Sequence, residues 1–292
     1  MFSTTPYKPT YIIASNFIET CIFDLTTSQI AFLPKKLPLS LCNRRLCNSR
    51  NFFKSIRDLY YPVTVSSIVL PYTDNEKSET KLSIIQNGKS FGYKNTIQLC
   101  SFETAAAIRA LSSANLEPEE SDICIFIFHM ETKICATILQ FNCTNCWVPL
   151  KYFMAPVNLR HDELRKFCHN LIVSAPPSSK LHTFVIAYTK EMLEARRLFF
   201  VNLFKENVLH FIDFEKPDEF GLKGFLGGFL IKAQILAGFE VSKKCNVSNV
   251  SDWNFKACVN GKDIFKFDSQ FKELPFKEEK KLEICPGTLF EV

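Results

Sequence analysis

The feature that most constrains the fold of this chain is an order of predicted elements that occurs twice. The first set comprises three strands, a helix, a strand and two helices, at residues 11–14, 20–25, 30–33, 51–60, 63–70, 74–86 and 102–114. The second set has the same order, at residues 124–128, 135–141, 147–153, 162–172, 181–187, 192–204 and 222–233. The strands are short apolar runs, and the helices carry apolar residues three or four positions apart. The matching order predicts an internal structural duplication.

The duplication predicts a chain of two lobes and a tail. We expect a first lobe at residues 1–114, a second at 115–239 and a β-rich tail at 240–292. A chain of 292 residues is long enough for about two compact units. Two packed βββαβα units, each RNase H-like, describe the actin-like ATPase fold. The sequence therefore predicts an α/β protein of that fold, followed by a short C-terminal β segment.

The composition is that of a globular protein. Apolar residues make up 47% and charged residues 22% of the chain. The net charge of +5 is scattered, so we expect no direct nucleic-acid site. No apolar run reaches the ~18 residues that a membrane span needs, so we expect no membrane contact. Because residues 1–10 lack the features of a signal peptide, we expect a cytoplasmic protein with reduced cysteines.

Several segments resemble the 70-kDa heat shock protein family. Ile68–Lys77 (IVLPYTDNEK) and Thr104–Ile108 (TAAAI) resemble two of its landmarks, a strand ending in Val-Pro and a Glu-Pro-Thr-Ala-Ala-Ala segment. In the second lobe, Phe184–Phe204 resembles the strand and helix of the adenosine segment. Pro217–Glu219, followed by Gly228 and Gly238, resembles the helix that closes the ATPase domain. These matches keep the family's order along the chain.

Two stretches are shorter than in that family. Pro34 to Pro71 and Ile172 to Phe184 leave no room for the two outer B subdomains, which we expect to be largely deleted. The tail is similar to the start of the family's β substrate-binding domain, but no helical lid follows. Within the family, the chain is most similar to the lidless branch that pairs with a J-domain protein in a ribosome-associated complex. The segment Pro286–Phe290 of the tail resembles that branch.

The first phosphate turn of the family reads Asp-Leu-Gly-Thr-Thr. The matching run here is Ala14-Ser-Asn-Phe-Ile18, so Ala14 replaces the carboxylate, Asn16 the glycine and Phe17 a threonine. Such turns need glycine because their amides approach phosphate oxygens, and they need Asp because Mg²⁺ takes hard oxygen ligands. The resemblance therefore implies a first turn without its phosphate chemistry.

The second phosphate turn and the adenosine loop are changed as well. The family sequence Asp-Leu-Gly-Gly-Gly-Thr aligns with Phe128–Lys133, so Phe128 replaces the Asp, Met130 a glycine and Lys133 the Thr. The adenosine Gly-Gly becomes Ala187-Tyr188. We expect Phe17, Phe128 and Tyr188 to fill the old nucleotide cleft, where each buried ring would contribute about 2–3 kcal/mol.

These losses imply a protein that is not an enzyme and needs no cofactor or metal. The resemblance implies a co-chaperone or scaffold, with a J-domain co-chaperone, the ribosome or nascent chains as partners. An alternative is an ATP-binding chaperone with residual nucleotide affinity. In that case Asn16 would adopt a left-handed turn and Glu131 would hold a metal.

A C-x-x-C pair offers a third interpretation. Cys143 and Cys146 have the spacing of a redox pair or of half a zinc site, with His129, His161 or His169 as further ligands. A zinc site needs a second spaced pair, which the sequence does not supply nearby. Ordinary buried or loop thiols are therefore the preferred interpretation.

Overall fold

The computed structural model describes residues 10–16, 18–33, 47–72, 78–93, 97–176, 182–189, 194–205, 207–239, 243–248, 255–259, 262–267 and 290–291. Within them the first sheet has the order β3-β2-β1-β4-β5. Its strands are β1 (Tyr11–Ser15), β2 (Thr20–Asp24), β3 (Ile30–Phe32), β4 (Val65–Tyr72) and β5 (Ile97–Ser101). The second sheet has the order β10-β9-β6-β7-β8. Its strands are β6 (Ile123–His129), β7 (Lys133–Phe141), β8 (Trp147–Pro156), β9 (His182–Tyr188) and β10 (Val208–Asp213).

The two sheets have the same topology. In each, the first three strands in sequence pair antiparallel, and the fourth and fifth extend the sheet in parallel from the first. This confirms the predicted duplication and the α/β class, and the chain has the actin-like ATPase fold. The fifth strand of each sheet, β5 and β10, was missing from the predicted order. Both are edge strands with mostly half-buried residues, so their apolar pattern is weak.

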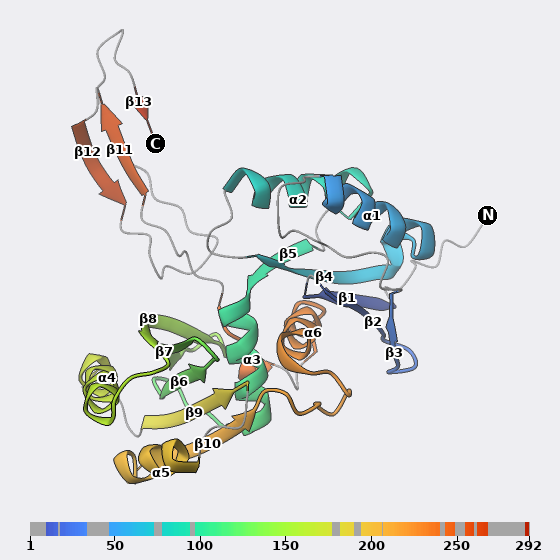
Figure 1. Cartoon of the computed structure of the whole chain (residues 1–292). Coiled ribbons are helices and arrows are strands. Elements are labelled where there is room, and N and C mark those ends of the chain that lie inside the picture. The colour runs from blue at the N-terminus through green and yellow to red at the C-terminus, as the bar shows by residue number, and fades with distance from the viewer. Residues whose placement is uncertain are drawn as a thin grey trace, which may run out of the picture.

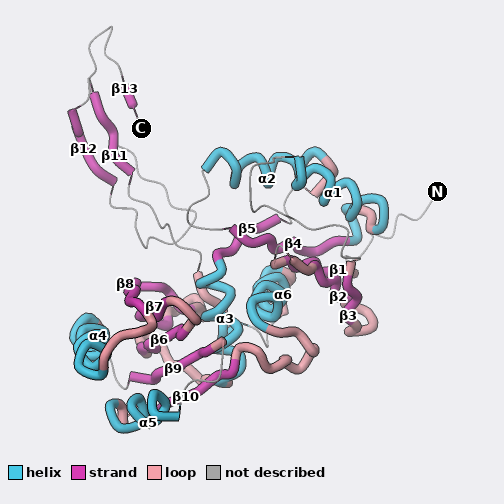
Figure 2. The backbone as a smooth tube through the Cα atoms, in the orientation of Figure 1, coloured by secondary structure: helices cyan, strands magenta, loops and turns pink. Residues whose placement is uncertain are grey.

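Helices fill three layers around the two sheets (Figures 1 and 2). The outer layers are α1 (Cys47–Leu59) and α2 (Ser78–Ser90) on the first sheet, and α4 (His161–Ser174) and α5 (Glu194–Leu203) on the second. The helices α3 (Phe102–Ala114) and α6 (Gly224–Leu236) lie between the sheets. The helix α2 runs past its predicted end at residue 86 and continues to Ser90, with Gly88 buried against Phe53. Asp74, where this helix is predicted to begin, lies outside the described residues.

The two central helices tie the halves of the chain together. The helix α6 comes from the second half, yet its Leu226, Phe229 and Leu230 share a core cluster with Ile12 and Ala14 of the first sheet. The helix α3 comes from the first half, and it packs on the second sheet in the same way. Its side of that core includes Ile108 and Leu111, and the sheet contributes Val185 and Ala187. Each half therefore completes the core of the other.

In the described part of each shortened connection, the structure has one helix. The third and fourth strands are joined through residues 33–64, where the structure describes α1 and a 3-10 turn (Pro62–Thr64), and through 157–181, where it describes α4. After α6, a 3-10 turn (Lys243–Cys245) leads to Val247, which bridges Trp147 at the start of β8. A third sheet pairs β11 (Phe255–Val259) with β12 (Lys262–Phe267) and β13 (Phe290–Glu291). Among the described helices, none is both long and apolar enough to cross a bilayer.

Candidate functional site

The first predicted phosphate turn joins β1 to β2 and is closed by the side chain of Asn16. The Asn16 side-chain oxygen accepts hydrogen bonds from the Ile18 amide at 3.1 Å and the Glu19 amide at 2.8 Å. The Asn16 amide donates to the Glu19 carbonyl oxygen at 3.1 Å. Ala14 is fully buried under the central helices, and Phe17 lies outside the described residues. The Ile18 and Glu19 amides, which could otherwise face a phosphate, are therefore already used within the turn.

The second predicted phosphate turn joins β6 to β7. The Met130 amide donates to the Lys133 carbonyl oxygen at 2.9 Å, which makes this a tight hairpin turn. Met130 is half-buried against the core that surrounds α3, while Lys133 is half-buried at the start of β7. Phe128, one residue before the end of β6, is 2% exposed. The structure therefore places an aromatic ring where the resemblance implies a metal-binding carboxylate.

Phe128 belongs to a chain of rings between the halves, which we call the aromatic seam: Phe102, Phe128, Phe214, Phe225 and Phe229. Phe102 at the start of α3 lies 5.0 Å from Phe225 and 5.5 Å from Phe229 of α6, measured between ring centroids. Phe128 lies 5.7 Å from Phe225 and 4.9 Å from Phe214. Most of these contacts are edge-to-face, a geometry that stabilises aromatic pairs beyond their buried area. The seam joins side chains of both lobes through α6.

The predicted adenosine positions lie at the end of β9. Ala187 is fully buried in the core under α3, but Tyr188 is only half-buried. Its carbonyl oxygen accepts a hydrogen bond from the Phe214 amide at 2.8 Å, and its side chain lines a cavity of about 440 Å³. Tyr188 therefore borders an open space, unlike Phe128.

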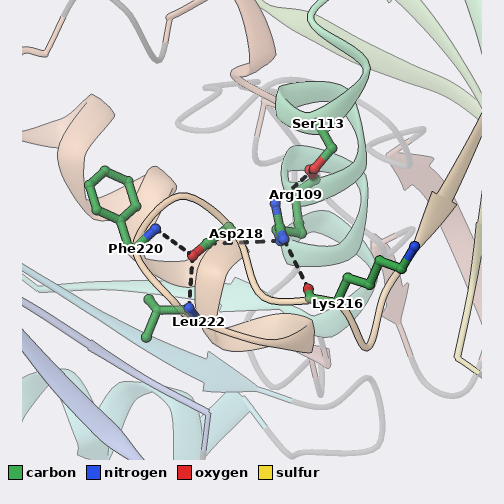
Figure 3. A network of polar contacts seen from close by, with 6 residues as sticks. All are labelled: Arg109, Ser113, Lys216, Asp218, Phe220 and Leu222. Carbon is green, nitrogen blue, oxygen red and sulfur yellow. Dashed lines mark hydrogen bonds and ion pairs between the residues drawn. The ribbon is translucent and has the colours of Figure 1, made fainter.

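Arg109 and Asp218 are two of the polar residues that line that cavity. They belong to one network of polar contacts (Figure 3). Arg109 lies in α3, which begins after Ser101, whose hydroxyl accepts from the Thr104 amide at 3.0 Å. The Arg109 guanidinium donates to Ser113 Oγ at 2.7 Å and to the Lys216 carbonyl oxygen at 3.3 Å. Its Nε atom lies 3.9 Å from Asp218 Oδ2, and the two side chains are 7% and 5% exposed.

Asp218 organises the loop that connects β10 to α6. Its Oδ1 atom accepts from the Phe220 amide at 2.9 Å and the Leu222 amide at 2.8 Å. Burial lowers the pKa of Arg109 from its usual range, and the charges of Asp218 and Glu219 oppose that effect. The neighbouring helix leaves no spare room, because a methyl group at Gly227 would lie 2.6 Å from Asp218 Oδ2. The pair is thus held between α3, α6 and the loop.

The residues of the zinc or redox interpretation do not converge. Cys143 is exposed, and Cys146 is buried with its sulfur 2.9 Å from Ser248 Oγ. His129 Nε2 lies 2.7 Å from the Arg196 guanidinium, and burial followed by the charge of Arg196 lowers the pKa of His129. The ring of His161 packs against Phe199. Within the described ranges, no group of three His, Cys, Asp or Glu side chains is placed to hold a metal.

Sequence reasoning missed the Arg109–Asp218 pair. Asp218 entered only through the resemblance of Pro217–Glu219, and Arg109 was not singled out. The signal was present in the sequence: Arg109 is a lone charge within the run Ala105–Leu111, all of which is buried in the structure. A single cation on the buried part of a helix requires a partner elsewhere in the chain.

Comparisons with known proteins give similarity at the level of structure alone. No protein-family model matches the chain, and no curated protein matches it significantly. A glucokinase from an Antarctic psychrotroph aligns with a TM-score of 0.40 and 8% identity, covering 75% of this chain and 96% of that one. The polyphosphate/ATP-glucomannokinase of Arthrobacter sp. strain KM gives 0.39 and 11%, covering 78% and 99%. A Bacteroides thetaiotaomicron protein described as having an actin-like ATPase fold and unknown function gives 0.34 and 8%, covering 73% and 93%. With scores this low, the fold assignment rests on strand order and connections.

Proposed function

We propose that this chain is a non-catalytic relative of the 70-kDa heat shock proteins that acts in the cytoplasm as a co-chaperone or scaffold. One observation supports the loss of catalysis: the Asn16 side chain binds the Ile18 and Glu19 amides of the first turn, while Phe128 places a ring at the second. Removing a single electrostatic donor from an active site typically costs about 3–4 kcal/mol of transition-state stabilisation. Losing the donors and carboxylates of both turns together removes the basis for phosphoryl transfer.

The proposed partners follow from the family resemblance rather than from a surface in the structure. A J-domain co-chaperone, the ribosome or nascent chains would use this protein as a binding platform. The aromatic seam supports a platform role, because it packs the two halves against each other at the place where a nucleotide-driven chaperone would open and close. Two lobes packed together in this way are suited to holding a partner in place.

The catalytic half of the proposal is tested with Mg-ATP. We expect no ATP hydrolysis, and no rise in melting temperature with millimolar Mg-ATP beyond that given by adenosine. A ligand at 100 times its Kd stabilises a fold by about 2.7 kcal/mol, which such an assay detects easily. An additional stabilisation that requires both Mg²⁺ and the triphosphate would overturn the proposal in favour of an ATP-binding chaperone.

The partner half is tested by reconstitution. The purified chain is sedimented through a sucrose cushion together with ribosomes. The experiment is done with and without a J-domain co-chaperone purified from the same cells as the ribosomes. We expect co-sedimentation that depends on the J-domain protein and survives moderate salt. If the chain stays in the supernatant in every combination and forms no complex with the J-domain protein on gel filtration, the co-chaperone role is wrong.

A further inference from the structure

The stretch from Leu25 to Arg57 contains no acidic residue. It holds seven of the chain's 35 cations: Lys35, Lys36, Arg44, Arg45, Arg50, Lys54 and Arg57. The other 28 cations are fewer than the 30 acids, so the net positive charge of the chain comes entirely from this stretch. The first four of the seven lie outside the described residues, and the last three lie in α1.

The helix α1 displays its three cations in one row, which we call the basic row. Arg50, Lys54 and Arg57 are spaced by four and three positions, so they share one face of the helix. Each residue adds a rise of 1.5 Å, which makes the row about 10 Å long. All three are exposed, and in the part of the chain that the structure describes none of them forms an ion pair or a hydrogen bond. The row is therefore free to meet an anion.

The surroundings keep the basic row positive and accessible. Asn87 of α2 donates a hydrogen bond to Ser49 Oγ at 2.7 Å, which brings the exposed Lys89 to the end of the row where Arg50 lies. The single acid of α1, Asp58, lies at the other end of the helix. Both helices cover the side of the first sheet that faces away from the second sheet (Figure 1). A row of cations on an open surface attracts a polyanion.

An exposed aromatic ring follows the basic row. Tyr61 lies two residues beyond the end of α1, and its side chain is 77% exposed. Its backbone is held in place, because its carbonyl oxygen accepts from the Thr64 amide at 2.9 Å and from Thr64 Oγ1 at 2.7 Å. Such a ring offers a face on which an unpaired base can stack. Cations combined with an exposed aromatic ring are typical of surfaces that bind single-stranded nucleic acid.

Two other anionic partners fit this surface less well. A helix that binds a membrane buries its apolar face in the bilayer, but Phe52, Phe53 and Ile56 of α1 are at most 2% exposed in the core of the first lobe. An acidic protein would need an apolar interface core, but the residues between the cations include the polar Asn51 and Ser55 on the outer side. Contacts to phosphates need only charged and polar groups.

We propose that α1 binds the backbone of single-stranded RNA. Arg50, Lys54 and Arg57 contact neighbouring phosphates, and a base stacks on Tyr61. The inference deepens the proposed function, and the choice of RNA over DNA rests on the ribosome as the proposed partner. It revises the expectation of no direct nucleic-acid site, which took the net charge as scattered over the whole chain.

The full chain is titrated with a fluorescent oligouridine of about 16 nucleotides at about 50 and 200 mM salt. Three phosphate contacts to a single strand give a slope of about −2 in log K against log salt, so we expect saturable binding that is at least tenfold weaker at the higher salt. An oligothymidine of the same length should bind no more tightly. No binding at the lower salt, an affinity that salt does not change, or tighter binding of the DNA would overturn the proposal. Binding of phosphatidylserine vesicles or polyglutamate in place of the RNA would reassign the surface.

Two triple variants with the same net charge locate the binding. The test variant replaces the basic row with glutamine: Arg50→Gln/Lys54→Gln/Arg57→Gln. The control replaces three exposed cations of the second lobe: Arg165→Gln/Lys166→Gln/Lys205→Gln. We expect the test variant to bind the oligouridine at least tenfold more weakly at the lower salt, with a flatter salt slope, and the control to bind like the parent. Equal losses in the two variants would show general charge attraction and overturn the assignment to α1.

The stacked base has its own test. Tyr61→Ala should weaken binding at least fivefold without changing the salt slope, whereas Tyr61→Phe keeps the ring and should bind like the parent. Unchanged affinity in Tyr61→Ala would overturn the stacking. The titration contains neither ribosomes nor a J-domain protein. Failure to bind RNA therefore refutes this surface, while failure of co-sedimentation by a chain that binds RNA refutes the proposed role.

Discussion

Arg109 Nε of α3 lies 3.9 Å from Asp218 Oδ2 of the β10–α6 loop, so a cation from the first half is buried beside a carboxylate from the second. Each side chain also holds backbone groups. Arg109 donates to the Lys216 carbonyl oxygen, and Asp218 accepts from the Phe220 and Leu222 amides. The pair therefore fixes the loop that leads into α6, the helix that completes the core of the first sheet.

We predict that Asp218→Ala lowers the free energy of unfolding by about 3–5 kcal/mol, because it leaves a buried guanidinium without its counter-charge. Urea denaturation followed by circular dichroism measures the change. The matched control is Glu219→Ala, which removes an exposed carboxylate next to it in sequence and should cost no more than about 0.5 kcal/mol. The double variant Arg109→Met/Asp218→Leu should be more stable than Asp218→Ala. Equal stability of Asp218→Ala and the parent would contradict a role for the pair.

The crossing of α3 and α6 gives a second prediction. A methyl group at Gly228 would overlap the carbonyl oxygen of Ala105, so the two helices meet there backbone to backbone. We expect Gly228→Ala to destabilise the protein by about 3 kcal/mol or more, since relief requires the helices to separate. Thermal unfolding measures this. Gly221→Ala is the control: it has open space but a φ of +74°, so only the conformational cost of about 1–2 kcal/mol applies. A smaller loss at Gly228 than at Gly221 would refute the close crossing.

The closed first turn gives a third prediction. Replacing Asn16 with Ala removes the oxygen that accepts from the Ile18 and Glu19 amides, and should cost about 1 kcal/mol. Asn16→Asp keeps that acceptor and should remain close to the parent in stability. Chemical denaturation of the two variants side by side makes the comparison. Equal loss in both would show that the side-chain oxygen does not hold the turn.

The duplicated fold was accessible from the sequence because its central strands are strongly apolar. Runs such as Ile123–His129 are buried along almost their whole length, and the pattern shows it. The edge strands β5 and β10 were not predicted, because their half-exposed positions mix polar with apolar residues. The sequence also could not predict that α3 packs on the second sheet and α6 on the first. A helix that is apolar on all sides, such as α6, has no polar face to indicate which sheet it covers. The Arg109–Asp218 pair depends on that exchange, so it could not be paired from sequence alone.

The aromatic seam gives a fourth prediction. Phe128→Ala removes a ring that contacts Phe214 and Phe225 in a closely packed region, and we expect a loss of about 3–5 kcal/mol in unfolding free energy. Phe32→Ala, at a ring that is 55% exposed at the edge of the first sheet, is the control and should cost less than about 1 kcal/mol. Urea titration of both variants decides. A mild effect at Phe128 would mean that the seam does not hold the two halves together.

Buried thiols make the stability of the fold dependent on alkaline pH. Burial raises the pKa of Cys21 and of Cys100 from 9.0 to about 12 each. Between these values the unfolded chain releases protons that the folded chain retains. The free energy of unfolding should therefore fall as pH rises above 9, by up to about 1.4 kcal/mol per pH unit for each thiol. Urea denaturation at pH 8, 9 and 10 measures the slope. Tyrosines and lysines titrate in the same range, so the double variant Cys21→Ala/Cys100→Ala supplies the reference. It should be less stable than the parent at pH 8 but lose less between pH 9 and 10, and parallel pH curves for the two proteins would disprove the linkage.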